Sequence, residues 1–221
     1  MKRPSKSLRR LLYSLSCLIL IPGCSPKPPI EEGDFLDSDL VELVKLDSSI
    51  LLDIRYATDQ NFINKAVYEQ PRVFLQRPAA EALVRVHNKL KAQGLGLLVF
   101  DGYRPWHLTK LFWDLTPDEL REFVASPERG SRHNRGCAVD VTMYHLATGK
   151  AVEMTSDFDE LNETDSSNYT AGTAEQRRNR NLLITIMEEQ GFKVLSGEWW
   201  HFDYQGWENY RIENIQFSEI N

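Results

Sequence analysis

The chain has 221 residues and carries 26 lysines and arginines against 32 aspartates and glutamates, a formal net charge of −6. Without the five basic residues that precede residue 24, the balance would be 21 basic groups to 32 acidic ones, a formal charge of −11. Such an acidic surface argues against nucleic acid or anionic lipid as a partner and favours a small neutral or zwitterionic ligand. The length is typical of a single domain.

The N-terminal segment predicts secretion. Its first ten residues hold five basic groups and no acid, and an apolar run from Leu11 to Ile21 follows. That order is typical of a signal peptide, and the run is far shorter than the roughly 20 residues of a membrane-spanning helix. The ending I-P-G-C resembles a bacterial lipobox. We therefore expect residues 1–23 to be a lipoprotein signal peptide and Cys24 to be lipidated, with a plain cleaved signal peptide as the alternative.

The next segment, residues 24–34, is proline-rich and polar, which is typical of an extended tether. The globular domain is then expected over residues 35–221. The lipid is the only membrane attachment that the sequence predicts, and it would place the domain on the periplasmic side of a bacterial cell envelope. Ser25 after the cysteine is compatible with the outer membrane of a Gram-negative cell. With Cys24 lipidated and the signal removed, Cys137 is the only remaining thiol, so no internal disulfide is expected.

Apolar spacing predicts the elements of the first half of the domain. Residues 51–56 are expected to form a strand, and residues 78–93 a helix, because apolar side chains recur there at steps of three and four. A buried strand is expected over residues 95–100 and a helix over 106–115. Thr116 is expected to cap a second short helix.

The second half predicts a strand over residues 139–144, a long polar loop over 155–176 and a helix over 181–190. Strand signals return on both sides of Gly197, which indicates a hairpin. Strands and helices alternate only loosely along the chain. The sequence therefore predicts a single α+β domain with a central, largely antiparallel sheet flanked by helices.

A candidate metal site begins in S-R-H-N-R-G-C-A-V-D, residues 131–140. A catalytic zinc takes three nitrogen or oxygen ligands and leaves a fourth position for water, and His133 and Asp140 can supply two of them. His201, in G-E-W-W-H-F-D-Y, is the third candidate because the flanking aromatic residues could exclude solvent from a cleft. Each of these residues could instead have a structural or surface role.

Glu198 and Arg104 are candidates for the chemistry. A metal-activated water needs a nearby carboxylate to accept its proton, and Glu198 stands three residues before His201. On an ideal strand two such positions face opposite sides, so both can serve one site only if a turn or bulge intervenes. Arg104, in D-G-Y-R-P, could stabilise an oxyanion, and an ion pair with Asp101 is the alternative.

Taken in order, D-G-Y-R-P, S-R-H-N-R-G-C-A-V-D and E-W-W-H-F resemble the D-alanyl-D-alanine dipeptidases of the vancomycin-resistance type. These are zinc peptidases that share a fold with D-Ala-D-Ala carboxypeptidases and the hedgehog signalling domain. The likeness runs from about residue 51 to residue 204. It implies one zinc ion held by His133, Asp140 and His201, with Glu198 as general base and acid and Arg104 stabilising the transition state.

The resemblance also implies that Tyr56, Ser131 and Asp159 read the free amino group of a dipeptide. Thr155 stands where the family usually has glycine, close to Asp159. The expected function is zinc-dependent hydrolysis of D-Ala-D-Ala or a similar small dipeptide. A peptidoglycan-stem D,D- or L,D-carboxypeptidase and a zinc-stabilised, non-catalytic peptide-binding module are the alternatives.

Overall fold

The computed structural model describes residues 26–220, so the predicted signal peptide and Cys24 lie outside the described residues. A five-stranded sheet with strand order β2-β4-β5-β7-β6 forms the centre of the domain. Its strands are β2 (Leu51–Leu52), β4 (Leu95–Asp101), β5 (Ala138–His145), β6 (Phe192–Leu195) and β7 (Glu198–Tyr204). Only the β2–β4 pair is parallel. The predicted α+β fold with a largely antiparallel sheet is confirmed.

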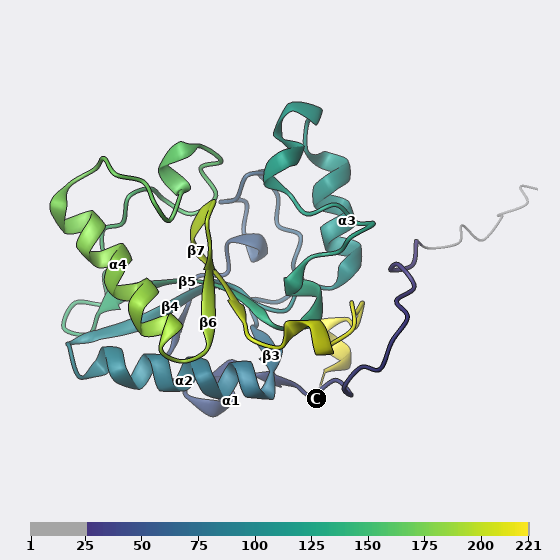
Figure 1. Ribbon diagram of the computed structural model, residues 1–221, viewed down its shortest axis with the longest axis horizontal. Helices are drawn as coiled ribbons and strands as arrows, with labels where there is room; N and C mark the ends of the chain where they lie inside the picture. Colours follow the sequence, from purple (N-terminus) through teal and green to yellow (C-terminus); the bar gives the residue numbers. More distant parts are fainter. Residues whose placement is uncertain (1–25, 221) are drawn as a thin grey trace, which may run out of the picture.

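Two long helices, α2 (Arg77–Lys91) and α4 (Ala174–Glu188), lie along one face of this sheet, with the short α1 (Leu43–Leu46) beside α2 (Figure 1). The buried face of α2 includes Leu83 and Val86, which are fully buried. Successive strand side chains point to opposite faces, so the other face of the sheet is left for a site. Helix α3 (Trp106–Leu115) follows the end of β4 and stands apart from α2 and α4 (Figure 1).

Smaller elements complete the fold. Strands β1 (Leu40–Glu42) and β3 (Phe74–Gln76) form a separate antiparallel pair that the sequence did not predict. Each has only three residues, too few for an alternating pattern to show. The 3₁₀ turns are η1 (Arg55–Ala57), η2 (Asp118–Phe123), η3 (Arg132–Arg135), η4 (Glu163–Asp165), η5 (Trp207–Asn209) and η6 (Phe217–Glu219).

Several predicted boundaries need correction. The strand expected over residues 51–56 ends at Leu52, and its second half is the turn η1. The segment after α3 is the 3₁₀ helix η2, and Thr116 does not cap it. The Thr116 hydroxyl instead donates to the carbonyl of Phe112 at 2.7 Å, and the Thr116 backbone N–H donates to the same carbonyl at 3.0 Å, so Thr116 caps the end of α3.

Helix α4 begins seven residues earlier than predicted. Thr173 caps it, because the Thr173 hydroxyl accepts a hydrogen bond from the Gln176 backbone N–H at 3.1 Å and the Gln176 side chain accepts from the Thr173 backbone. The first turns of α4 read A-E-Q-R-R-N-R-N and carry no apolar stripe. Apolar periodicity therefore misses this half of the helix, whereas the capping residues mark its start.

The proline-rich segment contacts the domain. Residues 26–34 contain no helix or strand, yet the Glu31 carboxylate pairs with Arg135 and accepts the backbone N–H of Ile212 at 2.7 Å. Arg135 belongs to η3, the turn that also carries His133. Among residues 26–220 there is no helix long and apolar enough to span a membrane.

We expect Glu31→Gln to lower the free energy of unfolding by about 1–2 kcal/mol, because it removes the charge from a partly buried ion pair. Urea denaturation measures this loss. Glu32→Gln is the matched control, since Glu32 is exposed. Equal stabilities of the two variants would show that the contact of Glu31 with the domain contributes nothing.

Candidate metal centre

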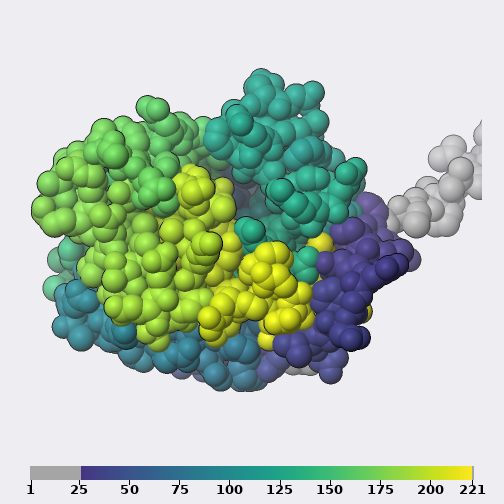
Figure 2. Space-filling model, viewed as in Figure 1, coloured from purple at the N-terminus to yellow at the C-terminus, as the bar shows by residue number. Residues whose placement is uncertain are grey.

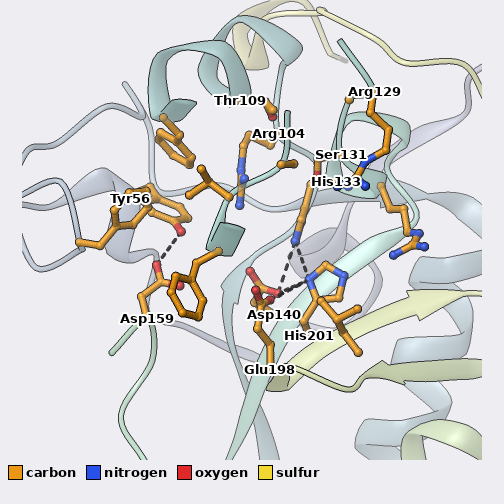
Figure 3. A pocket seen from close by; sticks show the side chains of 18 of the residues that line it. Tyr56, Arg104, Thr109, Arg129, Ser131, His133, Asp140, Asp159, Glu198 and His201 are labelled. Carbon is orange, nitrogen blue, oxygen red and sulfur yellow. Dashed lines mark hydrogen bonds and ion pairs between the residues drawn. The ribbon is translucent and has the colours of Figure 1, made fainter. Parts of the chain in front are cut away.

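Three protein segments bring the predicted metal ligands together. Asp140 in β5 and His201 in β7 are direct partners across the antiparallel pair, so their side chains lie on the same face of the sheet. His133 reaches them from η3, as Figure 3 shows. All three residues are buried, with exposed fractions of 3 to 6%. They form a group of side chains able to hold a metal ion.

The spacing of the three donor atoms matches a tetrahedral metal shell. His133 Nε2 and His201 Nδ1 are 3.1 Å apart, and Asp140 Oδ1 lies 3.0 Å from His201 Nδ1 and 3.4 Å from His133 Nε2. Ligand atoms on a tetrahedral zinc with bonds of about 2.0–2.1 Å stand about 3.3 Å apart. The three residues therefore fit a zinc ion without rearrangement.

The outer hydrogen bonds of both histidines direct the correct nitrogen to the site. His133 Nδ1 donates to the carbonyl of Gly102 at 2.7 Å, which leaves its Nε2 lone pair facing the metal position. His201 Nε2 lies 3.0 Å from the Asp203 carboxylate, which leaves Nδ1 free in the same way. Partners of this kind fix the tautomer and orientation of metal-binding histidines. Asp203 in turn pairs with Arg132 at 3.0 Å.

Glycine is required at position 136, where the chain turns between His133 and Asp140. Gly136 ends η3 with φ = 68°, in the left-handed region. A Cβ atom at this position would lie 2.5 Å from Leu40 Cδ2 and 3.2 Å from the Gln76 backbone nitrogen. The small residue therefore lets the His133 turn pack directly against β1 and β3. The neighbouring Cys137 is buried, and burial raises its pKa to about 12, so its thiol is not a nucleophile at neutral pH.

The local charges favour a bound cation. Although burial opposes ionisation of Asp140, the adjacent His133 and His201 hold its pKa well below its usual range. Burial likewise opposes a charge on His201, but hydrogen bonds to Asp140 and Asp203 outweigh it and raise the His201 pKa to about 10. Metal binding would therefore compete with a proton on His201.

Glu198 faces the same site because β7 is irregular. The β6–β7 register shifts so that Val194 opposes Phe202 while the next residue, Leu195, opposes Glu198. The extra residues of β7 turn Glu198 toward His201, and Glu198 Oε2 lies 3.6 Å from His201 Nδ1. The irregularity that Glu198 and His201 need in order to face one site is therefore present. Burial raises the pKa of Glu198 above its ordinary value while His201 opposes the shift, which suits a proton carrier near neutral pH.

The sequence left two roles open for Arg104, an ion pair with Asp101 and a place at the site, and the structure shows that Arg104 has both positions. Its Nε and Nη2 atoms donate to Asp101 Oδ2 at 3.1 and 2.7 Å, and its side chain also lines the cavity at the metal centre. The guanidinium carbon lies 4.7 Å from the centre of the Phe112 ring. Tyr68 donates a further hydrogen bond to Asp101 at 2.7 Å. The ion pair therefore holds the positive charge of Arg104 in a fixed position beside the site.

Tyr56 and Asp159 lie together at one end of the cavity (Figure 3). The Tyr56 hydroxyl donates to Asp159 Oδ2 at 2.6 Å. Asp159 has φ = 59°, a left-handed conformation that is uncommon outside glycine and often found at functional sites. Burial and the charges of Asp140 and Glu198 raise the Asp159 pKa well above its usual range. A cationic group of a ligand would relieve that cost.

Ser131 lines the same cavity but also has a structural role. Its hydroxyl accepts the backbone N–H of His133 at 3.2 Å, so it caps η3 and positions His133. All eight candidate site residues of the domain line this cavity of about 520 Å³. They are Tyr56, Arg104, Ser131, His133, Asp140, Asp159, Glu198 and His201. In Figure 2 the surface is hollowed between the teal segment that carries α3 and η2 and the yellow-green segment of β6 and β7.

Two functional neighbours were missed from the sequence. Asp203 contacts His201, and Asp101 holds Arg104. Asp203 stands two residues after His201 on a predicted strand, which places both side chains on one face, so period-two spacing could have identified it. Asp101 was considered only as a competing ion-pair partner, whereas it is the residue that orients Arg104.

The chain is similar to known peptidases over most of its length. A family model described as D-ala-D-ala dipeptidase, Peptidase_M15, matches residues 37–219. The D-alanyl-D-alanine dipeptidase of Escherichia coli (strain K12) is 33% identical over 181 residues, covering 82% of this chain and 92% of that protein. The D-alanyl-D-alanine dipeptidase of Enterococcus faecium is 35% identical over 171 residues, covering 68% of this chain and 83% of that protein.

Solved structures show more distant similarity. The vancomycin resistance D,D-dipeptidase VanXYg, in complex with a D-Ala-D-Ala phosphinate analog, is 18% identical, with a TM-score of 0.41 and coverage of 75% of this chain and 67% of that one. The LdcB LD-carboxypeptidase is 17% identical, with a TM-score of 0.42 and coverage of 86% and 82%. The family model and the sequence relatives extend over most of the domain, and they place the chain in the D-Ala-D-Ala dipeptidase family, Peptidase_M15.

Proposed function

We propose that this chain is a zinc dipeptidase that hydrolyses D-Ala-D-Ala, or a similar small dipeptide, to free amino acids. The observation that carries the proposal is the arrangement of donors in one cavity, where His133, Asp140 and His201 converge and Glu198 lies 3.6 Å from His201. The D-alanyl-D-alanine dipeptidases to which the chain is similar support the choice of substrate.

The metal is proposed to be zinc, held by His133 Nε2, Asp140 Oδ1 and His201 Nδ1. Two imidazoles and a carboxylate are a typical donor set for catalytic zinc, and the observed separations fit its tetrahedral shell. When bound, zinc would polarise the peptide carbonyl and lower the pKa of water toward neutrality.

The side chains around the metal position are proposed to transfer protons, stabilise the oxyanion and bind the substrate. Glu198 is placed to accept a proton from the attacking water and to return it to the leaving amine. Arg104, held by Asp101, presents a fixed positive charge to the oxyanion that develops on the carbonyl. Asp159, bonded to Tyr56, offers a carboxylate to the free ammonium of the substrate. A non-catalytic binding module would need neither Glu198 nor Arg104.

A substrate panel tests the proposed function. The zinc-loaded full chain is incubated with D-Ala-D-Ala, L-Ala-L-Ala and a pentapeptide ending in D-Ala-D-Ala, and released alanine is measured. Cleavage of D-Ala-D-Ala with little release from the other two is the expected result. Preferential cleavage of the pentapeptide would favour the carboxypeptidase, and no release from any of the three would favour the binding module.

Asp203 is expected to strengthen zinc binding through His201. Asp203→Asn removes the charge that faces His201 Nε2 while keeping the side-chain shape, so we expect zinc affinity to fall about 10–100-fold. Competition with a fluorescent zinc chelator measures this affinity. Asp114→Asn on α3 is the control, because Asp114 is exposed and pairs with Lys110, far from the metal ligands in the sequence. Unchanged affinity in Asp203→Asn would exclude the orienting role.

We also propose that a lipid on Cys24 attaches the domain to the periplasmic side of a bacterial cell envelope, at the outer membrane in a Gram-negative cell. The apolar run followed by I-P-G-C supports this proposal. Glu31 is only seven residues after Cys24, and an extended chain of that length spans at most about 25 Å. The anchor would therefore keep the domain close to the membrane surface.

Cys24→Ser should move the protein from the membrane fraction to the soluble fraction of a bacterial expression host. Immunoblotting of washed membranes measures the distribution. Cys17→Ser is the matched control, because it changes a cysteine of the signal segment and leaves the lipobox intact. Membrane association that survives in Cys24→Ser would contradict lipid anchoring.

A further inference from the structure

The cavity extends beyond the residues that the proposed function uses. Its lining also includes residues of η2, of the segment between η2 and η3, and Trp207. Figure 3 shows Arg129 and Ser131 on one side of the metal ligands, with Tyr56 and Asp159 on the other. The lining includes Arg129 and Arg132. Asp159 and Arg129 therefore place one acidic and one basic side chain on opposite sides of the metal ligands.

The lining includes three further arginines, Arg129, Arg132 and Arg135, which differ in whether their charge is paired. Arg132 pairs with Asp203 at 3.0 Å and lies over the Trp207 ring, with 4.8 Å between the guanidinium carbon and the ring centre. Arg135 pairs with Glu31 and donates to the carbonyl of Tyr210. The guanidinium groups of Arg132 and Arg135 are therefore both paired with carboxylates of the protein.

Arg129 is different. Within residues 26–220 its guanidinium forms no ion pair, although it lines the cavity and is exposed to solvent there. Glu122 also lines the cavity, and it forms no ion pair with Arg129. Only the backbone of Arg129 is bonded, through its N–H to the carbonyl of Ser126 at 3.2 Å, so the side chain is free to meet a ligand.

We propose that Arg129 is a specificity-determining residue that binds the C-terminal carboxylate of the substrate. This inference rests on the proposed function and adds the orientation of the peptide. A dipeptide is a zwitterion, so the carboxylate of Asp159 and the guanidinium of Arg129, on opposite sides of the metal ligands, fix its direction across the metal position. The N-terminal residue lies toward Tyr56 and Asp159, and the C-terminal residue lies toward Arg129.

The chemistry of the two groups supports this assignment. A guanidinium presents donors in a fixed planar fork that matches the two oxygens of a carboxylate. Arg104 cannot serve both roles equally, because its Nε and Nη2 donors are used by Asp101. The carboxylate is unchanged during peptide hydrolysis, so its binding contributes equally to substrate and transition state. Its loss should therefore raise KM more than it lowers kcat.

Two substrates and two forms of the protein are compared to test whether Arg129 binds the C-terminal carboxylate. The full-length zinc-loaded protein and its Arg129→Gln variant are compared on D-Ala-D-Ala and on D-alanyl-D-alaninamide, in which a neutral amide replaces the carboxylate. Arg178→Gln is the matched control, because Arg178 is an exposed arginine of α4 outside the cavity. Dissociation constants for both ligands are also measured by calorimetry in a Glu198→Ala background, with and without Arg129→Gln.

We expect Arg129→Gln to raise KM for D-Ala-D-Ala about 10–100-fold and to leave KM for the amide within about twofold. An equal loss on both substrates, or no loss on D-Ala-D-Ala, would overturn the assignment. The calorimetric arm separates this inference from the proposed function. If the parent protein binds D-Ala-D-Ala without cleaving it, the dipeptidase activity is rejected, and the dissociation constants still test whether Arg129 binds the carboxylate. If it neither binds nor cleaves D-Ala-D-Ala, both proposals are rejected.

Discussion

Glu198→Ala should lower kcat for D-Ala-D-Ala hydrolysis about 10²–10⁴-fold, the range that a positioned general base contributes, while one zinc ion per chain stays bound. The structure gives the reason. Glu198 reaches the site through the β7 irregularity, yet it is not one of the three converging donors. Removing its carboxylate takes away the proton acceptor and leaves His133, Asp140 and His201 in place. Steady-state kinetics and metal analysis on the same preparation measure both quantities.

Glu69→Ala is the control for this variant, because Glu69 is exposed and lies outside the cavity. It should match the wild type in turnover and zinc content. Near-normal turnover in Glu198→Ala would remove Glu198 from the proton-transfer role. Loss of zinc from Glu198→Ala would instead assign that residue to the metal shell.

His201→Ala should release the metal. The substitution removes one of three donors and leaves Asp140 and His133 without the partner that completes the group. We expect a loss of zinc affinity well beyond the 10–100-fold typical of an outer hydrogen-bond partner, and no measurable dipeptide hydrolysis at stoichiometric zinc. Chelator competition measures the affinity directly.

His145→Ala is the matched control, because His145 ends β5 on the exposed surface and is not among the grouped donors. Its zinc affinity should equal that of the wild type. Full zinc occupancy in His201→Ala under chelator competition would contradict the assignment of His201 as a ligand.

The sequence predicted the elements whose apolar pattern is regular. Helices α2 and α3 and strands β4, β5 and β7 were expected within a few residues of their observed bounds. The start of α4 was missed because its first turns are polar and only the Thr173 cap marks them. The three-residue strands β1 and β3 were missed because their pairing depends on contacts between distant segments.

The site was predictable where a motif carries the chemistry. The motifs S-R-H-N-R-G-C-A-V-D and E-W-W-H-F pointed to the candidate residues, but the convergence of these residues depends on features that spacing alone cannot give. Asp140 and His201 meet because β5 and β7 pair in one register, and Glu198 joins them because that strand is irregular. The positive φ of Asp159 is likewise a local conformation that its residue type does not predict.

The most direct test of the account is a zinc titration of metal-free protein, with release of D-alanine from D-Ala-D-Ala as the readout. The arrangement of His133, Asp140 and His201 predicts no activity in the metal-free protein and a linear rise to a plateau at one zinc ion per chain. Arg178→Gln should follow the same curve. Release of D-alanine by chelator-treated protein at the same rate as by zinc-loaded protein would contradict the central claim.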